Sequence, residues 1–330
     1  MNIRLYMALP KEQKEYLRKK LQGHSVHIIE ETVNDQNIDP DTEILGVFVN
    51  SPVPKKILKQ LPKLKGIATF STGYDHIDIK ATKKANIPVC SVKSYGEHTV
   101  AEYALMLMLA VQRKLYPAVK RVKENTFDWH GLQGSDTENK TIGIIGTGRI
   151  GKQMIRLLQG FDADILCTDV FPDLEFAKKH NARYVKLPEL IKSSDIISLH
   201  APLLPKTKHL INKRRIKTMK PGVILINTAR GGLIDSQALL WGLEQNIIGA
   251  AALDVIEGED LLEDPMGLLN HKHGEQDVKK SLLAKMLIDH PRVLVTPHNA
   301  FHSKEALQRI LDTSIENILS IARQQPENMV

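Results

Sequence analysis

The chain has 330 residues, of which 42% are hydrophobic and 25% are charged, a composition typical of a globular protein with room for two hydrophobic cores. Its formal net charge is +7, but the lysines are scattered over many segments without a nucleic-acid-binding motif, so we expect no nucleic-acid partner. The most apolar stretch, residues 101–111, is shorter than the roughly 20 residues of a membrane span. It predicts a buried helix, either in the core or between subunits, and no membrane partner.

The two cysteines, Cys90 and Cys167, lack the CxxC spacing of a redox or metal site. Cys167 falls within a predicted buried strand, and we expect both thiols to be reduced and structural. The first residues lack the long apolar stretch of a signal peptide. Together these features favour a cytoplasmic protein.

Apolar strands alternate with helical segments in the first 100 residues, a pattern that predicts a parallel α/β layer structure. Helices are predicted at Lys11–Leu21 and Lys55–Leu61. This region is long enough for a domain of its own. The predicted strands are Ile3–Met7, Val26–Ile29, Ile44–Val49, Gly66–Phe70 and Val89–Ser91.

A glycine-rich motif follows in the middle of the chain. The apolar run 141–145 predicts a buried strand, and Gly146-Thr147-Gly148-Arg149-Ile150-Gly151 leads into a helix that ends near Gly160. A second strand starts at Ile165 and is closed by Asp169, 23 residues after Gly146 and close to the ~20 expected for a ribose-binding acid. Strand, glycines, helix, strand and acid in this order predict a dinucleotide-binding βαβ unit.

The physical roles of these residue types are specific. One glycine makes a tight turn, another admits the pyrophosphate, and a third lets the helix pack on the strand. The helix N-terminus offers free N–H groups to the phosphates. Asp169 can accept hydrogen bonds from both ribose hydroxyls and would repel a 2′-phosphate, and no arginine follows it directly, so the predicted cofactor is NAD rather than NADP.

Beyond Asp169 the strand pattern resumes, and polar residues stand where strands end. Such positions carry the ligand site in a doubly wound sheet. The expected strands are Ile196–Leu199, Val223–Asn227, Ala250–Asp254 and Val293–Thr296. The polar residues at or after their ends are Arg230, Asp254, Glu259 and His298.

This set fits hydride transfer on a small 2-oxo or 2-hydroxy acid. A histidine has a pKa near neutrality and suits proton transfer, a carboxylate beside it favours the imidazolium, and an arginine matches a substrate carboxylate with two hydrogen bonds. Each residue also has an ordinary interpretation: Arg230 as a surface ion pair, Glu259 as part of a solvated acidic run, His298 as a helix cap. Their occurrence at consecutive strand ends, downstream of a cofactor motif, favours the catalytic interpretation.

The chain resembles the D-isomer-specific 2-hydroxyacid dehydrogenases, and within them the D-lactate dehydrogenases, over nearly its whole length. The motifs that carry the resemblance are Ser71–Asp78, Thr99–Glu102, Gly146–Gly151, Ser198–Pro202, Asn227–Gly231, Ala252–Val255 and Thr296–His298.

The resemblance implies roles for individual residues. Arg230 matches the substrate-orienting arginine, His298 the catalytic histidine and Glu259 its acidic partner, while Asp254 matches an aspartate that contacts the cofactor and supports the site. The implied substrate-binding residues are Asn50, Thr72, Gly73 and Tyr95. The implied cofactor-binding residues are Gly146, Gly148, Arg149, Ile150, Gly151, Asp169, His200, Pro202, Thr228, Ala229 and Asp254.

The resemblance also implies an α/β architecture of two doubly wound parallel-sheet domains. A Rossmann NAD-binding domain, residues 99–298, would be inserted into a flavodoxin-like substrate-binding domain made of residues 1–98 and 299–330. A homodimer is implied through the NAD-binding domain, with the helix around Glu97–Lys114 at the contact, and this favours the subunit-contact interpretation of that helix.

Some residues depart from the family pattern. Asp260-Leu261-Leu262 replaces the Glu-Pro of many glycerate- and glyoxylate-type members, which favours the lactate branch. Asn50 stands where some lactate-type members have tyrosine, so the size of the pocket stays open. His271 and His273 have metal-ligand spacing, but no third ligand is near in sequence, and we expect no metal.

Three rival functions remain beside reduction of pyruvate to D-lactate. Two belong to the same chemistry: a glyoxylate or hydroxypyruvate reductase, and a dehydrogenase for bulkier D-hydroxy acids. The third is of a different class, an NAD(H)-sensing binding protein like the corepressors built on this fold. Turnover of a 2-oxo acid would separate the enzymes from the binding protein.

Overall fold

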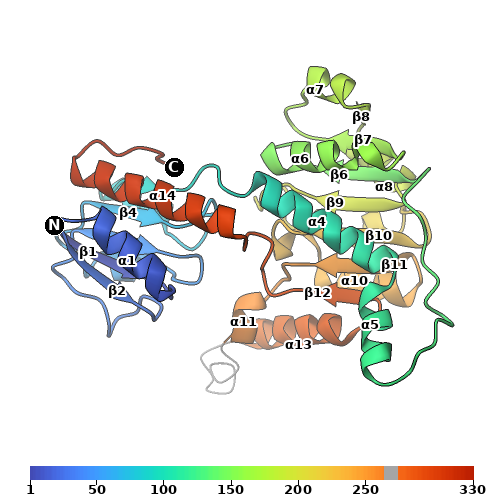
Figure 1. Cartoon of the computed structure of the whole chain (residues 1–330), viewed down its shortest axis with the longest axis horizontal. Helices are drawn as coiled ribbons and strands as arrows, with labels where there is room; N and C mark the ends of the chain where they lie inside the picture. The colour runs from blue at the N-terminus through green and yellow to red at the C-terminus, as the bar shows by residue number, and fades with distance from the viewer. Residues whose placement is uncertain (264–273) are drawn as a thin grey trace. The chain divides into compact units, whose positions relative to one another are not determined.

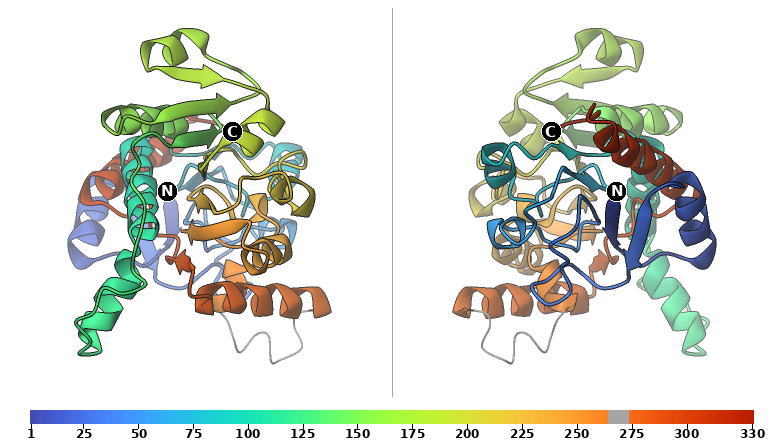
Figure 2. Two further views of the ribbon diagram at one scale, coloured as in Figure 1. Left: turned by 90° about the vertical axis from the view of Figure 1, so that its right-hand side faces the viewer. Right: turned by 90° about the vertical axis from the view of Figure 1, so that its left-hand side faces the viewer.

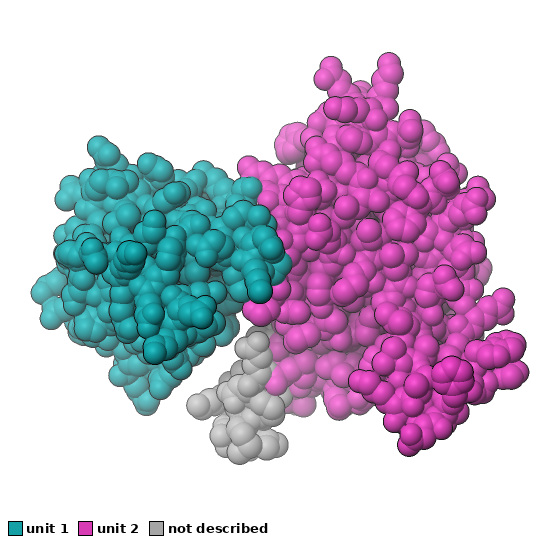
Figure 3. Space-filling view, in the orientation of Figure 1, with its two compact units in different colours: residues 1–95, 303–330 teal, residues 96–302 magenta. Residues whose placement is uncertain are grey.

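The computed structural model describes residues 1–263 and 274–330, so the His271 and His273 pair lies outside the described residues. The chain folds as two compact units (Figure 3). Unit 1 consists of residues 1–95 and 303–330, and unit 2 of residues 96–302. None of the described helices is long and apolar enough to span a bilayer.

Unit 1 is built on a five-stranded sheet in the order β2-β1-β3-β4-β5, with all neighbouring strands parallel (Figure 1). This is the strand order of flavodoxin-like folds. The strands are Asn2–Tyr6 (β1), Ser25–Ile29 (β2), Ile44–Val47 (β3), Gly66–Thr69 (β4) and Val89–Cys90 (β5). The helices are Lys11–Lys20 (α1), Lys55–Leu58 (α2), Ile79–Lys84 (α3) and Lys304–Ala322 (α14).

The last helix, α14, completes unit 1 although it is more than 200 residues away from the rest of the unit in sequence. Ile321 packs so closely on β4 that a Cβ atom at Gly66 would lie 2.7 Å from its side chain. Buried Asn317 donates a hydrogen bond to the carbonyl oxygen of Ser91 (3.1 Å). Both segments are therefore needed to form this core.

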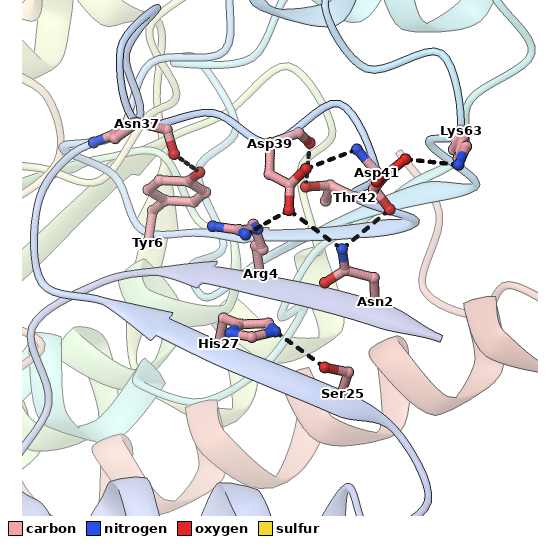
Figure 4. Close-up of polar contacts among 10 residues, drawn as sticks. All are labelled: Asn2, Arg4, Tyr6, Ser25, His27, Asn37, Asp39, Asp41, Thr42 and Lys63. Carbon is pink, nitrogen blue, oxygen red and sulfur yellow. Dashed lines mark hydrogen bonds and ion pairs between the residues drawn. The ribbon is translucent and has the colours of Figure 1, made fainter.

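Alternate side chains of β1 hold the connection between β2 and β3 through a polar cluster (Figure 4). The guanidinium of Arg4 pairs with the carboxylate of Asp39, and the amide of Asn2 donates to the same carboxylate (3.5 Å). The Tyr6 hydroxyl donates to the carbonyl oxygen of Asn37 (2.7 Å), and burial raises the pKa of this phenol. These bonds fix a connection that contains no helix.

Unit 2 is built on a seven-stranded parallel sheet in the order β12-β11-β10-β9-β6-β7-β8. The chain direction across the sheet reverses between β6 and β9, the point where doubly wound folds bind ligands. The strands are Thr141–Ile145 (β6), Asp164–Thr168 (β7), Ala182–Tyr184 (β8), Ile196–Leu199 (β9), Val223–Asn227 (β10), Ile248–Leu253 (β11) and Val293–Val295 (β12).

Helices cover both faces of this sheet, because consecutive strand residues point to opposite sides. Ile142 and Ile144 pack in a cluster with α4 and α6, whereas Ile145, Ile197 and Leu199 pack in a cluster with α8, α10 and α13. The helices of unit 2 are Glu97–Gln112 (α4), Leu115–Lys123 (α5), Arg149–Leu157 (α6), Leu174–Lys179 (α7), Leu187–Ser193 (α8), Lys213–Ile216 (α9), Ser236–Glu244 (α10), Glu259–Glu263 (α11) and Glu275–Asp289 (α13).

The apolar helix expected at residues 101–111 is α4, and its inner face lies in the core of unit 2. Leu107 and Met108 are fully or almost fully buried, and each such side chain contributes about 1.5–3 kcal/mol to folding. Met106, on another side of the helix, stays 48% exposed. The helix is thus a core helix on one face, and its other face is open to solvent in the single chain.

The two doubly wound parallel sheets confirm the fold class expected from the sequence. The predicted strands agree with the observed ones to within two residues at each end. Strand β8, Ala182–Tyr184, was not predicted, because its three residues are only partly buried or exposed and carry no apolar pattern.

Candidate active site

The glycine-rich loop joins β6 to α6. Gly146 has a φ of +93°, and a Cβ atom there would lie 2.7 Å from the carbonyl carbon of His200. A Cβ atom at Gly151 would lie 2.0 Å from the carbonyl oxygen of Gly146, so α6 packs directly against this turn. Gly148 differs, because a Cβ atom there meets nothing within 4 Å. The fold itself does not require this glycine, and the open space suits the close approach of a pyrophosphate.

Asp169 stands directly after β7, beside the glycine-rich loop. Its carboxylate accepts hydrogen bonds from the backbone N–H groups of Thr147 (2.6 Å) and Phe171 (2.9 Å). These bonds fix the carboxylate at the end of the strand and leave further lone pairs on both oxygens. Arg149 and Ile150 begin α6, and Arg149 lies 3.7 Å from the carboxylate of Glu97.

Two buried polar atoms near the end of β9 and β10 have no hydrogen-bond partner among the described residues: Nδ1 of His200 and Oγ1 of Thr228. The other ring nitrogen of His200 lies 2.9 Å from the hydroxyl of Ser198, and burial lowers the pKa of this histidine to about 4. His200 is therefore neutral at physiological pH. Unpaired buried polar groups are costly unless a ligand supplies the missing bonds, so these atoms and the space at Gly148 fit a bound dinucleotide.

The polar residues of unit 2 occupy the carboxyl ends of six consecutive strands, from β7 to β12 (Figure 1). Since all the strands are parallel, these ends share one edge of the sheet. Pro202 and Ala229 belong to the connections after β9 and β10. In sheet order the strand-end residues are Asp169, Gly146, His200, Thr228 with Arg230, Asp254 and His298.

His298 and Glu259 form a hydrogen-bonded pair at this edge. Nδ1 of His298 lies 2.9 Å from Oε1 of Glu259, and both side chains are 38% exposed. The pKa of His298 is raised, chiefly by this hydrogen bond, and further by the charges of Glu259 and Asp254; burial and Arg230 act in the opposite direction. Because Glu259 engages Nδ1, Nε2 is the atom that can exchange a proton with a ligand.

Asp254 holds the loop that carries His298. Its buried carboxylate accepts hydrogen bonds from the hydroxyl of Thr296 (2.5 Å) and from the backbone N–H groups of Asn299 and Ala300 (both 2.8 Å). The N–H of His298 donates to the carbonyl oxygen of Asp254 (2.9 Å). His298 has a φ of +50°, an uncommon conformation for a residue with a side chain, and these bonds maintain it.

Arg230 follows β10 in a turn made by the buried side chain of Asn227. The Asn227 amide donates to the carbonyl oxygen of Arg230 (2.9 Å), and its oxygen accepts from the N–H of Ala229 (3.1 Å). Nη1 of Arg230 donates to the carbonyl oxygen of Ala229 (2.8 Å). The charge of Arg230 is felt by His298, so the structure brings the predicted arginine, histidine and acid together within unit 2.

The expected substrate-binding residues lie in unit 1, after the ends of three neighbouring strands. Asn50 follows β3, Thr72 and Gly73 follow β4, and Tyr95 follows β5. The hydroxyl of Thr72 donates to the carbonyl oxygen of Val92 (2.6 Å), which holds the loop after β4. Asn50 and Thr72 are exposed, as binding residues at a sheet edge are.

Three residues of the site were missed by sequence reasoning: Asn227, Thr296 and Ser198. Each contacts a predicted residue through a hydrogen bond rather than carrying an obvious reactive group itself. Asn227 and Ser198 stood inside motifs that mark the family resemblance, which was the available signal.

Comparison with known proteins places the chain in a family. A family profile described as "D-isomer specific 2-hydroxyacid dehydrogenase, NAD binding domain" matches residues 105–300. The D-lactate dehydrogenase of Escherichia coli is 36% identical over 284 residues, which cover 85% of this chain and 84% of that protein.

Two solved structures are similar over almost the full length. The D-lactate dehydrogenase from Aquifex aeolicus complexed with NAD and lactic acid has a TM-score of 0.88 and 31% identity, and the match covers 98% of this chain and 96% of the other. The pyruvate reductase of Chlamydomonas reinhardtii has a TM-score of 0.86 and 34% identity, covering 99% and 97%. The chain therefore belongs to the D-isomer-specific 2-hydroxyacid dehydrogenase family and is an NAD-dependent oxidoreductase.

Proposed function

We propose that this protein reduces a small 2-oxo acid to the D-2-hydroxy acid, with pyruvate as the favoured substrate and D-lactate as the product. The observation that carries the proposal is the His298–Glu259 pair, with Arg230 near it, on the unit that has the dinucleotide loop. The names of the similar D-lactate dehydrogenases and of the pyruvate reductase support pyruvate. The departure from the Glu-Pro pattern after Glu259 also favours the lactate branch.

When bound, NADH supplies the hydride that reduces the C2 carbonyl. The backbone N–H groups at the start of α6 hold the pyrophosphate, Asp169 accepts hydrogen bonds from the ribose, and His200 and Thr228 offer their unpaired polar atoms. We assign the remaining contacts to Arg149, Ile150, Pro202, Ala229 and Asp254, as the family resemblance implies.

His298 acts as the proton donor during reduction. Its imidazolium donates Nδ1–H to Glu259 and presents Nε2–H to the C2 oxygen, which takes the proton as the carbonyl becomes a hydroxyl. Glu259 fixes the ring and stabilises its charged form. Arg230 binds the substrate carboxylate through its planar fork and polarises the C2 oxygen.

Unit 1 is assigned the role of substrate domain, and unit 2 that of the NAD-binding domain. Thr72 and Gly73 present backbone N–H groups for the substrate carboxylate, and Asn50 and Tyr95 line the pocket for the remaining part of the substrate. Because Asn50 is small compared with a tyrosine, a bulkier 2-oxo acid is the alternative substrate, next to glyoxylate and hydroxypyruvate.

The test is the initial rate of NADH oxidation across pyruvate, glyoxylate, hydroxypyruvate, 2-oxoisocaproate and phenylpyruvate. We expect pyruvate to give the highest kcat/KM, with kcat of ordinary enzymatic size, roughly 1–10³ s⁻¹. A higher kcat/KM with a bulkier acid would replace pyruvate by that substrate class. No turnover with any of the five would refute the reductase proposal and favour a binding protein.

Asp169 provides a prediction about cofactor preference. Asp169→Ala should raise KM for NADH and relax the preference for NADH over NADPH, because one hydrogen-bonding carboxylate and its repulsion of the 2′-phosphate are both lost. The measurement is kcat/KM with each cofactor at saturating 2-oxo acid. The matched control is Asp164→Ala at the other end of the same strand, which should leave the ratio unchanged. An unchanged ratio in Asp169→Ala would remove Asp169 from ribose recognition.

We also propose a homodimer formed through unit 2. Helix α5 follows α4, has no buried residue and extends beyond the sheet of its own unit (Figure 2). Exposed apolar side chains gather on α5 and the segment after it, a pattern typical of subunit contacts. They are Leu115, Tyr116, Val119, Val122, Phe127 and Trp129, with exposures from 44% to 95%.

Trp129→Glu, combined with Val119→Glu, should convert the dimer to a monomer, since charges would enter an apolar contact. Light scattering after size-exclusion chromatography measures the mass. The control Leu282→Glu changes an equally exposed leucine on α13 and should leave the dimer intact. A wild-type mass of one chain would contradict the dimer.

A cytoplasmic location is proposed on the state of the thiols. Cys90 and Cys167 are free and buried, and burial raises their pKa values to about 11 and about 12. Neither thiol is reactive under these conditions. Both suit a reducing compartment in which no disulfide is required.

A further inference from the structure

A second histidine–carboxylate pair lies in unit 2, in the loops that flank Arg230 and Glu259. His209 belongs to the connection after β9, and Glu257 to the turn after β11. A hydrogen bond of 2.9 Å joins Nε2 of His209 to Oε1 of Glu257. The two side chains are 37% and 19% exposed, so the bond is partly shielded from competing water. The mechanism described above does not use this pair.

One end of the pair belongs to the turn that carries the acid of the site. Glu257 precedes Glu259 by two residues, and Gly258 between them turns the chain with a φ of +86°. The N–H of Ile256 donates to Oε2 of Glu259 (3.1 Å), and the N–H of Glu259 donates to the carbonyl oxygen of Ile256 (3.3 Å). The turn is therefore closed on itself, and a bond that fixes Glu257 also fixes the position from which Glu259 reaches His298.

The other end of the pair holds the segment that follows the arginine. The N–H of His209 donates to the carbonyl oxygen of Gly232 (2.8 Å), two residues after Arg230. The backbone of His209 thus binds the 3-10 helix Gly231–Leu233, while its side chain binds Glu257. A single residue connects the loop of the carboxylate-binding arginine with the turn of Glu259.

Between these two loops the contact is backbone against backbone. A Cβ atom at Gly231 would lie 2.2 Å from the carbonyl carbon of Ile256, so no side chain fits between them. Such a contact limits the distance but does not fix the register. His209 has a φ of +50°, as His298 has, and a residue keeps this uncommon conformation only where its surroundings impose it.

We propose that His209 and Glu257 form a positioning pair that holds the turn of Glu259 in register with Arg230. The proposal rests on the roles assigned above to Arg230, Glu259 and His298. Neither His209 nor Glu257 transfers a proton; their hydrogen bond sets the geometry in which Glu259 meets His298. Losing the bond therefore affects the chemical step and leaves NADH binding largely intact.

The test uses variants that keep or remove the hydrogen bond in the full-length protein. Asparagine tolerates the left-handed backbone of residue 209 but is too short to place a donor at Nε2, whereas glutamine can place one there. His209→Asn and Glu257→Ala should each lower kcat roughly ten- to a hundred-fold, the cost of a small misplacement at the reacting centre. His209→Gln and Glu257→Gln should recover most of this loss, and the double variant His209→Asn/Glu257→Ala should be no slower than either single one.

A second readout does not need turnover. The ring of His298 is titrated by NMR in the protein without substrate, and its resonance is assigned by its loss in His298→Asn. In His209→Asn the pKa of His298 should move down towards the ordinary value of ~6.5, because its bond to Glu259 weakens. The groups that act on His298 are Glu259, Asp254 and Arg230, and none of them is changed in this variant.

The outcomes separate this inference from the proposed function. A wild type without 2-oxo acid turnover would refute the function, and the His298 titration would still decide the positioning role. An unaltered kcat and unaltered His298 titration in His209→Asn would overturn the inference. Equal losses of NADH binding and thermal stability without recovery in the glutamine variants would also overturn it, as a merely structural role. The matched control is His27→Asn on the exposed edge strand of unit 1, where His27 lies 3.0 Å from Ser25 (Figure 4).

Discussion

Replacing His298 with asparagine is expected to lower kcat for 2-oxo acid reduction by about 10²- to 10⁴-fold, the usual contribution of a general acid. Asparagine is the informative substitution, because it accepts the φ of +50° that this position requires. The fold should therefore survive, and Kd for NADH, measured by fluorescence titration, should stay near that of the wild type. The proton donor is removed without disturbing the loop.

The pH profile gives the sign of the same effect. The pKa of His298 is raised by Glu259, so the imidazolium persists above the pH at which an ordinary histidine loses its proton. Reduction, which needs the protonated ring, should be fastest below this raised pKa and fall as the pH rises through it. Oxidation of the hydroxy acid should show the opposite dependence, and His298→Asn should lose both limbs.

A matched control lies before the same strand. His290 precedes β12, whereas His298 follows it, and His290→Asn should leave kcat within about two-fold of wild type, as an ordinary substitution outside the site. If His298→Asn kept the kcat and the pH profile of the wild type, the proton donor would have to be another group.

The Arg230→Lys enzyme should lose about 10- to 100-fold in kcat/KM for the 2-oxo acid. Lysine keeps the positive charge but cannot offer two parallel hydrogen bonds to a carboxylate. A hydrogen bond to a charged group contributes about 1.5–3 kcal/mol, which corresponds to this range of fold-change. Arg230→Gln, which removes the charge as well, should be slower still. Steady-state kinetics with pyruvate and with NADH varied separately would show the loss on the 2-oxo acid side.

Arg214→Lys on the exposed side of α9 is the control, because it makes the same chemical change in unit 2 at a solvated position. Its kcat/KM should equal that of the wild type. An Arg230→Lys enzyme with unchanged kcat/KM would show that the substrate carboxylate is bound elsewhere.

Local sequence patterns predicted the parts of the structure that depend on near neighbours. The glycines of 146–151 and the acid at 169 obey rules of a single βαβ unit, and the structure places them accordingly. The two parallel sheets follow from alternating strands and helices. Strand-end residues could be assigned to one edge because parallel strands share that edge.

Hydrogen bonds between distant loops could not be predicted in this way. Asp254 meets Thr296 across 42 residues, and His209 meets Glu257 across 48. Such pairs depend on the exact register of two loops, and a serine, threonine or asparagine in a loop gives no sign of its partner. The structure consequently adds a supporting layer, including Asn227 and Thr296, to reactive residues that the sequence already indicated.

The division of unit 1 into two segments has a consequence for synthesis on the ribosome. A nascent chain emerges from its N-terminus, so residues 1–95 are outside the ribosome long before α14 is made. During that interval Gly66 and β4 lack the helix that covers them, and an open apolar sheet face favours aggregation. Unit 2, which is continuous, can fold first. The inserted unit then brings the two segments of unit 1 together, and maturation of the enzyme ends with the docking of its last helix.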